Sequence, residues 1–319
     1  MRVVFLGTPE FAVPSLKALL DPTRHDCELV GVITQPDRPA GRGHKLTPPP
    51  VRLVAEESNV PFFQPHRLRD DPEALRFLKE KKPQLVVVVA FGQILPPDFF
   101  NYPSLGSINV HASLLPRYRG AAPIAHALMN GEKETGVTIM KIDEGMDTGD
   151  ILSQSAVPVG ENTTGGELED ILALKGAELL IETIPRYVEG KIQAKPQNHE
   201  QASYAPRIKK EDARIDWNRP APQIHNRIRA FNPWPTAFAD FRGEWVKIWR
   251  SQKMKENGED LRASGRVGTI AAVAKDEIVV ECGRRTFLSL QELQLPNRKR
   301  VSARDFVNGT SLRLGELLT

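Results

Sequence analysis

Leu85-Val86-Val87-Val88-Val89-Ala90 is the longest clean apolar run of the chain, and it is hydrophobic at every position. A strand of this kind is typical of the centre of a parallel sheet, where helices cover both faces. The run is far shorter than the roughly 20 apolar residues that a membrane-spanning helix needs. It therefore predicts a buried central strand in a protein without a membrane span.

Shorter apolar runs on either side of this strand alternate with helix-like segments. We expect strands at 2–7, 28–34, 60–63, 84–90 and 107–112, and a further pair at 135–142 and 150–157. The intervening helices are expected at 13–20, 49–57, 71–81, 120–131 and 165–189. This alternation predicts an α/β fold with a Rossmann-like, mostly parallel sheet and helices on both faces.

A ligand of such a sheet binds beyond the carboxyl ends of the strands. Gly7, the turn Ala90-Phe91-Gly92 and His111 all fall at such ends. Gly7-Thr8-Pro9 lacks the Gly-x-Gly-x-x-Gly pattern of dinucleotide binders, so a nucleotide cofactor loses its usual support.

Three polar residues stand out at this edge of the sheet. Asn109 and His111 end the strand at 107–112, and Asp147 follows His111 by 36 residues in a turn-rich stretch. Residues i and i+2 of a strand point to the same face, so Asn109 and His111 project together. A carboxamide, an imidazole and a carboxylate suit acyl transfer to an amine, in which an oxyanion forms and the attacking nitrogen loses a proton. We predict that these residues are catalytic.

Ser113 is the nearby candidate for a covalent nucleophile, but no Gly-x-Ser-x-Gly turn surrounds it. Direct attack by the substrate's own amine is the simpler interpretation. Arg117 and Arg119 follow in the same stretch. Each could contact substrate or serve the local structure.

The two cysteines, Cys27 and Cys282, are far apart in the sequence, and the seven histidines show no His-x-x-x-His spacing. A structural disulfide is not expected, nor is a metal site, because a thiolate site needs more ligands at closer spacing. The first strand begins directly after Met1, which leaves no room for a signal or transit peptide and predicts a cytoplasmic protein.

The charges are distributed unevenly between the two ends of the chain. Residues 207–319 carry 22 Lys and Arg against 14 Asp and Glu, a net charge of +8, and residues 1–206 carry 21 against 26, a net charge of −5. Such an imbalance suggests that the C-terminal part binds a polyanion. The chain of 319 residues is long enough for two domains. We expect a first domain at 1–189, a polar linker at 190–208 and a basic domain at 209–319.

The C-terminal domain is expected to be a small β-barrel. A helix at about 220–231 precedes five strand-like runs at 236–242, 244–250, 266–274, 277–282 and 285–291. All four tryptophans lie in this part of the chain. Trp245 and Trp249, four apart in one strand, are expected to share a face in the core.

Two sequence blocks resemble the 10-formyltetrahydrofolate-dependent formyltransferases, namely 109–120 (NVHASLLPRYRG) and 143–150 (DEGMDTGD). The blocks 7–12 (GTPEFA), 35–43 (QPDRPAGRG) and 231–235 (FNPWP) extend the resemblance along the whole chain. These three point to the branch of the family that formylates charged initiator tRNA. The resemblance implies an OB-like C-terminal barrel and a catalytic trio of Asn109, His111 and Asp147.

The implied reaction moves the formyl group of the co-substrate 10-formyltetrahydrofolate to the α-amine of methionine on initiator tRNA, for translation initiation. The folate is expected against the turn after the central strand and the loop after His111, at Phe91, Gly92, Gln93, Ile94, Leu95, Ser113, Leu114, Leu115, Pro116 and Asp143. The tRNA phosphates are expected at Arg38, Arg42, Lys45, Arg298, Lys299 and Arg300. Without the resemblance, these basic residues would be interpreted as a solvated surface. We expect a monomer that binds no metal.

Two alternatives stay open at this point. The same catalytic domain could formylate a small amine, such as an amino sugar nucleotide, or hydrolyse formyl-folate, although such relatives would lack the basic C-terminal barrel. Alternatively, the chain could bind tRNA with a decayed folate site, but the intact Asn109, His111 and Asp147 argue against this.

Overall fold

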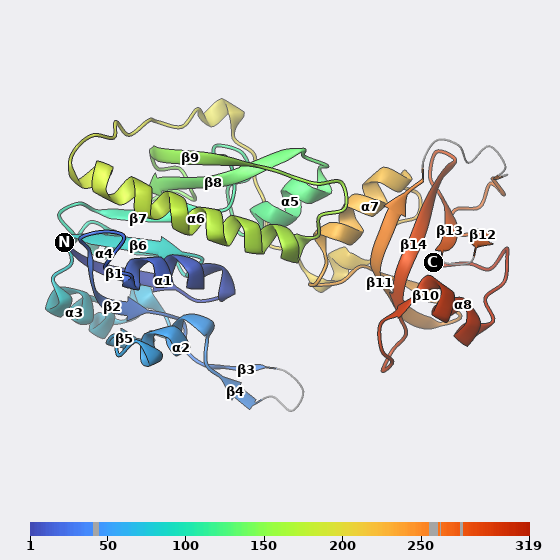
Figure 1. Ribbon diagram of the computed structural model, residues 1–319, viewed down its shortest axis with the longest axis horizontal. Coiled ribbons are helices and arrows are strands. Elements are labelled where there is room, and N and C mark those ends of the chain that lie inside the picture. The colour runs from blue at the N-terminus through green and yellow to red at the C-terminus, as the bar shows by residue number, and fades with distance from the viewer. Residues whose placement is uncertain (41–44, 255–260, 262, 275–276) are drawn as a thin grey trace. The chain divides into compact units, whose positions relative to one another are not determined.

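The computed structural model describes residues 1–40, 45–254, 261, 263–274 and 277–319 (Figure 1). The chain divides into two compact units. Unit 1 comprises residues 1–123, 134–158 and 169–205, and unit 2 comprises residues 124–133, 159–168 and 206–319. Two short segments from the middle of the sequence thus belong to the C-terminal unit. The linker at 190–208 stays a prediction about where the functional domains meet.

Unit 1 is built on a seven-stranded sheet with the strand order β5-β2-β1-β6-β7-β8-β9 (Figure 1). Its strands are β1 (Arg2–Gly7), β2 (Glu28–Ile33), β5 (Phe62–Phe63), β6 (Leu85–Val89), β7 (Ser107–His111), β8 (Glu134–Lys141) and β9 (Ile151–Pro158). The strands from β5 to β7 pair in parallel, and β8 and β9 add an antiparallel edge. All five residues of β6 are buried. The predicted mostly parallel α/β fold is confirmed.

Helices connect these strands along the chain. Those of unit 1 are α1 (Val13–Leu20), α2 (Pro50–Glu57), α3 (Pro72–Lys81), α4 (Pro97–Phe100) and all but the first turn of α6 (Gly165–Val188), whereas almost all of α5 (Pro123–Met129) belongs to unit 2. Leu78 of α3 and Phe99 of α4 pack in one core cluster with Val86 and Val88 of β6. Because Val88 is paired with Asn109, the side chain of Asn109 points to this same face of the sheet.

The other face of β7 is covered by α6. A Cβ atom added to Gly176 would lie 2.9 Å from Cγ1 of Val110, so helix and strand approach closely here. Val110 points toward α6, and its neighbours Asn109 and His111 consequently point away from it. The two polar side chains thus emerge on the face that α6 leaves uncovered.

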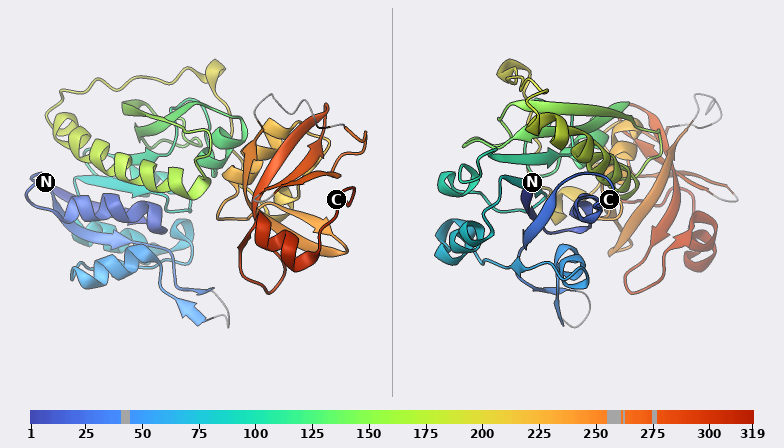
Figure 2. Two further views of the ribbon diagram at one scale, coloured as in Figure 1. Left: turned by 45° about the vertical axis from the view of Figure 1, so that its right-hand side comes forward. Right: turned by 60° about the vertical axis from the view of Figure 1, so that its left-hand side comes forward.

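Unit 2 contains an antiparallel sheet with the order β10-β11-β14-β13-β12, to which β15 adds by pairing with β14. Its strands are β10 (Phe238–Phe241), β11 (Glu244–Lys253), β12 (Ile270–Ala274), β13 (Glu277–Cys282), β14 (Thr286–Gln294) and β15 (Val301–Ser302). The strands curl, and the helices α7 (Ala221–Ala230) and α8 (Ala303–Thr310) belong to the same unit (Figure 2). Ile224 and Ile228 of α7 and Phe306 of α8 pack in the core cluster of this unit. The predicted small β-domain is confirmed.

The last residues of the chain join the two edge strands of this curled sheet. The amide of Asp240, in β10, donates to the carbonyl of Thr319 at 2.6 Å, and the amide of Ile270, in β12, donates to the carbonyl of Glu316 at 2.8 Å. Leu318 between them is 2% exposed. The C-terminal tail thus satisfies edge groups that would otherwise be unpaired.

The prediction that Trp245 lies in the core beside Trp249 is wrong. Trp245 is 61% exposed and stacks on Phe238, with 4.8 Å between the ring centroids. Val246 and Ile248 occupy the buried face of β11, and a bulge follows Ile248 that shifts the register with β14. Successive residues of a strand point to opposite faces, so Trp245 lies on the face that points away from the core.

Three further properties bear on function. In the described ranges, no helix is both long and apolar enough to cross a membrane. Cys27 and Cys282 are both free, and burial raises the pKa of the Cys282 thiol to about 12. No group of three or more His, Cys, Asp or Glu side chains placed to hold a metal ion occurs among the described residues.

Candidate active site

The end of β7 positions two of the predicted catalytic side chains. His111 is 6% exposed and is paired across the antiparallel ladder with Thr138 of β8. Asn109 is partly buried, and within the described residues no hydrogen bond uses its carboxamide. Both amide N–H donors of Asn109 are therefore available to a ligand.

The structure brings Asp147 to His111. Oδ2 of Asp147 lies 3.6 Å from Nδ1 of His111, and Nε2 of His111 lies 3.0 Å from the carbonyl oxygen of Tyr118. A carbonyl only accepts, so Nε2 carries a hydrogen and donates it to Tyr118. Nδ1 then faces a carboxylate that also only accepts. At 3.6 Å the two groups are within ion-pair distance but too far apart for a hydrogen bond.

The turn that carries Asp147 has an unusual backbone. Asp147 has φ of +52°, in the left-handed region that side-chain-bearing residues seldom adopt. Its Oδ2 accepts a hydrogen bond from the amide of Gly120 at 2.8 Å. Nε2 of Gln197 donates to the carbonyl oxygens of Asp147 and Gly149 at 2.9 and 2.8 Å. The carboxylate and the main chain of the turn are thus held from two sides.

The loop after His111 is packed into the protein by its own hydroxyl groups. Oγ of Ser113 is buried and donates to the carbonyl of Arg117 at 2.6 Å. Thr138 donates to the carbonyl of Ser113 at 2.6 Å and accepts from the amide of Leu115 at 3.1 Å. These contacts give Ser113 a structural task and agree with the interpretation that it is not a nucleophile. Leu114 and Pro116 are partly buried in the same loop.

Arg119 was expected either to contact substrate or to serve the local structure, and its contacts favour the structural role. The side chain is 1% exposed, the largest of those that are almost fully buried among the described residues. Its Nε and Nη2 donate to Oε1 of Gln197 at 3.1 and 2.6 Å, and Nη1 lies 3.3 Å from Nδ1 of His199. Arg117 is exposed and lies over the ring of Tyr118 at 5.2 Å.

Segment 195–205 contributes to the site, although its sequence is polar and without a period. The amide of Tyr118 donates to Oγ of Ser203 at 2.9 Å, and the amide of Arg119 donates to the carbonyl of Ser203 at 2.8 Å. Gln197 lies in the same segment. Sequence reasoning missed these residues, because no local pattern marks a contact with a loop about 80 positions earlier.

The turn after β6 presents its backbone to solvent. Phe91 is buried, and its carbonyl accepts from Thr8 at 3.0 Å and from Gln35 at 2.7 Å. The N–H and C=O groups of Gly92, Gln93 and Ile94 make no hydrogen bond within the described residues. Open donors and acceptors of this kind suit the edge of a pterin ring. The predicted folate role of this turn, with Leu95 partly buried behind it, stays a prediction.

The remaining predicted folate residue, Asp143, lies on the exposed side of the turn that carries Asp147. Its Oδ1 accepts from the amide of Gly145 at 3.1 Å and from the hydroxyl of Thr148 at 2.7 Å. These contacts stabilise the turn. A contact with folate stays a prediction for this residue as well.

The basic loop of unit 1 contains a hairpin that the sequence did not predict, formed by β3 (Arg38–Ala40) and β4 (Lys45–Thr47). Arg38 donates to Oε1 of Gln35, and Lys45 is exposed. Arg42 lies outside the described residues. Nearby, hydrogen bonds from Gln64 and then from the Arg52 guanidinium lower the pKa of Asp37.

The basic run of unit 2 is exposed, as a contact with phosphates would require. Arg298, Lys299 and Arg300 are all on the surface. Arg300 also pairs with Glu292 and lies over the ring of Trp249, 5.0 Å from its centroid. Lys247 lies 5.9 Å from the same ring. Part of the positive charge here is therefore used to hold Trp249 in place.

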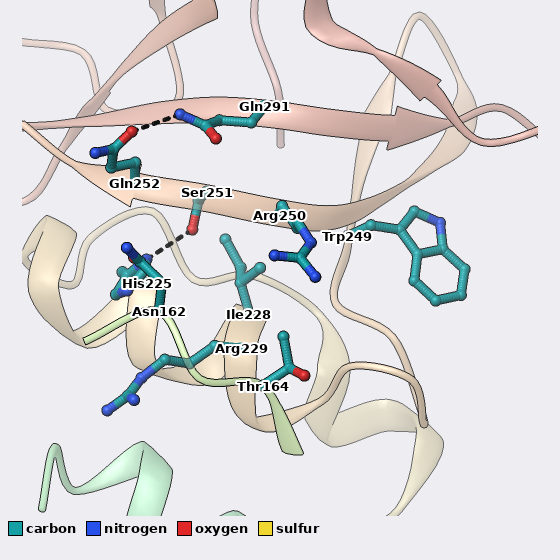
Figure 3. Close-up of a pocket in the computed structure, with 10 residues that line it drawn as sticks. All are labelled: Asn162, Thr164, His225, Ile228, Arg229, Trp249, Arg250, Ser251, Gln252 and Gln291. Atoms are coloured by element: carbon teal, nitrogen blue, oxygen red, sulfur yellow. Dashed lines mark hydrogen bonds between the residues drawn. The ribbon is translucent and has the colours of Figure 1, made fainter. Parts of the chain in front are cut away.

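A polar pocket of about 130 Å³ lies in unit 2 (Figure 3). His225 lies in its wall, 1% exposed, with Nδ1 3.0 Å from Oγ of Ser251 and Nε2 3.0 Å from the carbonyl of Glu161. Burial is the main cause that lowers the pKa of His225. Arg229, also buried, donates to the carbonyl of Gly160 at 3.0 Å. The buried His225 and Arg229 thus bond to a hydroxyl group and to main-chain carbonyls, which indicates a structural role.

Family models match both parts of the chain. The model described as formyl transferase matches residues 1–184, and the model of the formyl transferase C-terminal domain matches residues 207–311. The methionyl-tRNA formyltransferase of Synechococcus sp. (strain JA-3-3Ab) is 49% identical over 316 residues, which cover 99% of this chain and 97% of the relative. That of Pelotomaculum thermopropionicum is 48% identical over 318 residues, which cover 100% and 98%.

Solved structures share the fold. A sugar 3N-formyltransferase, WlaRD, solved in the presence of dTDP and 5-N-formyl-THF, matches with a TM-score of 0.66 and 20% identity, over 94% of this chain and 99% of its own. The methionyl-tRNA formyltransferase of Clostridium thermocellum matches with a TM-score of 0.55 and 17% identity, over 81% and 95%. At these identities the likeness concerns the fold alone. It corrects one expectation, since a sugar formyltransferase also has a counterpart of most of unit 2.

Proposed function

The chain belongs to the formyl transferase family, and we propose that it transfers the formyl group of 10-formyltetrahydrofolate to the α-amine of methionyl initiator tRNA. The observation that carries this proposal is the identity of 49% with a methionyl-tRNA formyltransferase along almost the whole of both chains. The product, formylmethionyl-tRNA, serves translation initiation. The proposed enzyme works in the cytoplasm as a monomer, without a metal.

The proposed nucleophile is the substrate's amine. The α-amino group of a free chain end has a pKa of roughly 7.7–8.0, and esterification to tRNA lowers it, so much of the amine is neutral near pH 7. Its nitrogen attacks the formyl carbon and forms a C–N bond. The carbonyl oxygen becomes an oxyanion, for which Asn109 supplies amide donors that no described residue occupies.

His111 and Asp147 act as one unit in this proposal. The carbonyl of Tyr118 occupies Nε2, so the Nδ1 edge of the ring is the one that faces the reacting groups. An N–H at Nδ1 stabilises the oxyanion, and the Asp147 carboxylate, 3.6 Å from Nδ1, stabilises the positive ring. Asp147 also accepts the proton that the amine loses. The bond from the formyl carbon to N10 of the folate then breaks, and N10 takes up a proton.

The proposed folate site is the turn 91–95 together with loop 113–116 and Asp143. Its support is the open backbone of Gly92, Gln93 and Ile94 next to a strand end, where ligands of α/β sheets bind. The proposed tRNA contacts are Arg38, Arg42 and Lys45 in unit 1 and Arg298, Lys299 and Arg300 in unit 2. Their support is charge and, for the five that are described, accessibility, since phosphate contacts need both.

A small-amine acceptor is the second candidate. The fold shared with a sugar formyltransferase over 94% of the chain favours it as strongly as the fold favours tRNA. The net charge of +8 after residue 206 distinguishes the two candidates, because an RNA acceptor stem is a polyanion and an amino sugar nucleotide carries few charges.

The proposal is tested by supplying formyl-labelled 10-formyltetrahydrofolate with one acceptor at a time. The acceptors are charged initiator tRNA, uncharged initiator tRNA, a dTDP-linked amino sugar, and water alone. We expect label on the charged tRNA and on none of the others. Label on the amino sugar with none on tRNA would support the second candidate, and release of formate in water alone would indicate a hydrolase.

A further inference from the structure

Gln197 connects a buried cation to the turn that carries the Asp147 carboxylate. Its carboxamide has one orientation that satisfies its neighbours, because Oε1 faces the guanidinium of Arg119 and Nε2 faces two carbonyl oxygens. A flipped amide would oppose donors to donors and acceptors to acceptors. At 5% exposure, water cannot replace these contacts, so the side chain is fixed.

Arg119 is an unusual anchor. Burial of a guanidinium is costly unless its donors are hydrogen-bonded. In the described part of the chain no carboxylate lies within ion-pair distance of Arg119, and a neutral amide oxygen takes two of its hydrogen bonds. The main chain of Arg119 is also held in place, because its amide donates to the carbonyl of Ser203 at 2.8 Å and its carbonyl accepts from the amide of Ala205 at 2.7 Å. The cation is thus a rigid base for Gln197.

The turn at Asp147 needs such support. The left-handed φ of +52° at Asp147 is stable only when the surroundings determine it. The amide donors of Gln197 contact the carbonyl of Asp147 itself and that of Gly149, at the two ends of this bend. The amide of Gly120, which follows Arg119 directly, donates to the Asp147 carboxylate at 2.8 Å. One rigid assembly therefore sets both the main chain and the carboxylate of Asp147.

We propose that Gln197 is a positioning residue for the formyl transfer, which holds Asp147 against His111 through the Asp147 and Gly149 carbonyls while Arg119 fixes its orientation. The kinetic part of this inference rests on the proposed function. Gln197 touches no reacting atom in this account. Its role is to keep Oδ2 of Asp147 near Nδ1 of His111, a separation of 3.6 Å in the structure.

Two substitutions separate positioning from folding. Gln197→Glu keeps the size of the side chain and an oxygen for Arg119, to which it adds an ion pair, but it cannot donate to the two carbonyls. Gln197→Ala removes both sets of contacts. Gln193→Ala, at an exposed position four residues before Gln197, is the matched control. We expect Gln197→Glu to fold, because the ion pair with Arg119 offsets part of the loss of the two carbonyl contacts.

The kinetic test compares kcat and KM for formyl transfer to charged initiator tRNA. A misplacement of about 1 Å can cost about 100-fold in rate, so we expect kcat to fall roughly 10- to 100-fold in Gln197→Glu and in Gln197→Ala, with KM for both substrates within about threefold of wild type. Gln193→Ala should match the wild type. A Gln197→Glu enzyme with wild-type kcat would overturn the inference.

A double-mutant cycle identifies the group through which Gln197 acts. If it acts through the Asp147 carboxylate, then Gln197→Glu should have almost no further effect on kcat in an Asp147→Asn background. Losses that multiply would overturn the inference, because they would show an independent, general structural role.

The ¹⁵N chemical shift of Nδ1 of His111 gives a readout that needs no activity, since it reports the proton on that atom. We expect it to change in Gln197→Glu and to stay unchanged in Gln193→Ala. If the wild type transfers no formyl group but the shift still changes in Gln197→Glu and not in Gln193→Ala, the proposed function is refuted and the positioning role is supported. An unchanged shift in Gln197→Glu would overturn the positioning role whatever the activity.

Discussion

Asp147→Asn is the substitution for which we expect the largest specific loss of rate. The side chain keeps its size and can still accept from the amide of Gly120, but it loses the charge that faces Nδ1 of His111 at 3.6 Å. At an effective dielectric constant of about 20, two unit charges at this separation attract by about 4 to 5 kcal/mol. That corresponds to roughly 1,000-fold in rate, within the range of about 100- to 10,000-fold for general acid–base groups.

The assay is single-turnover formyl transfer to charged initiator tRNA, with folate binding measured separately by calorimetry. Folate affinity should survive, because the carboxylate is assigned to the reacting groups and not to the pterin. Glu144→Gln, which removes an exposed charge from the same turn, should retain the wild-type rate. An Asp147→Asn enzyme with more than about a tenth of the wild-type rate would remove the carboxylate from the mechanism.

Three further predictions address other parts of the molecule. Asn109→Ala and His111→Ala should each lose about 2.7–4 kcal/mol of transition-state stabilisation, which lowers kcat, and the double variant should lose less than the sum. Additive losses, or an effect confined to KM, would instead indicate that the two residues position the substrate. Burial lowers the pKa of His225, so below pH 6.5 the unfolded chain binds a proton that the folded chain does not, and the free energy of unfolding should decrease as the pH is lowered, by up to about 1.4 kcal/mol per pH unit. Thermal unfolding between pH 7 and 5 should show a flatter pH dependence in His225→Gln, and identical slopes would contradict this. Removal of residues 315–319 deletes the buried Leu318 and backbone hydrogen bonds to both edge strands, and should lower the free energy of unfolding of unit 2 by at least about 4 kcal/mol. An unchanged midpoint in urea unfolding would refute the role of the tail in joining the edge strands.

Much of the fold of unit 1 could be predicted because its signals are local. The β6 run is apolar at every position and is buried at every position, and the helices around it begin and end within a few residues of their expected bounds. The assignment of residues 159–168 to unit 2 could not be predicted. They join it through long-range contacts, such as that between Glu161 and His225, which no period along the chain encodes.

The catalytic trio could be nominated from the sequence, since Asn109 and His111 share a strand and their spacing fixes their common face. The approach of Asp147 could be expected from the motif alone, and the structure supplies the distance. The contact between Asp147 and Gln197 could not be predicted from the sequence, because Gln197 is 50 residues away in a segment of linker-like composition. The prediction for Trp245 failed because tryptophan was taken as the core residue, whereas the smaller apolar residues Val246 and Ile248 of the alternating pattern fill the core.

Whether the acceptor is a methionyl-tRNA held by its phosphates can be decided by measuring kcat/KM as a function of salt for two acceptors. One is charged initiator tRNA and the other is methionine methyl ester, which has the same amine and no RNA. We expect a far larger kcat/KM for the tRNA, which falls between 50 and 200 mM salt with a log–log slope of roughly −0.7 to −0.9 per phosphate contact. For the ester we expect a small kcat/KM that does not change with salt. Equal values for the two acceptors, or a tRNA value independent of salt, would contradict a tRNA acceptor held by its phosphates.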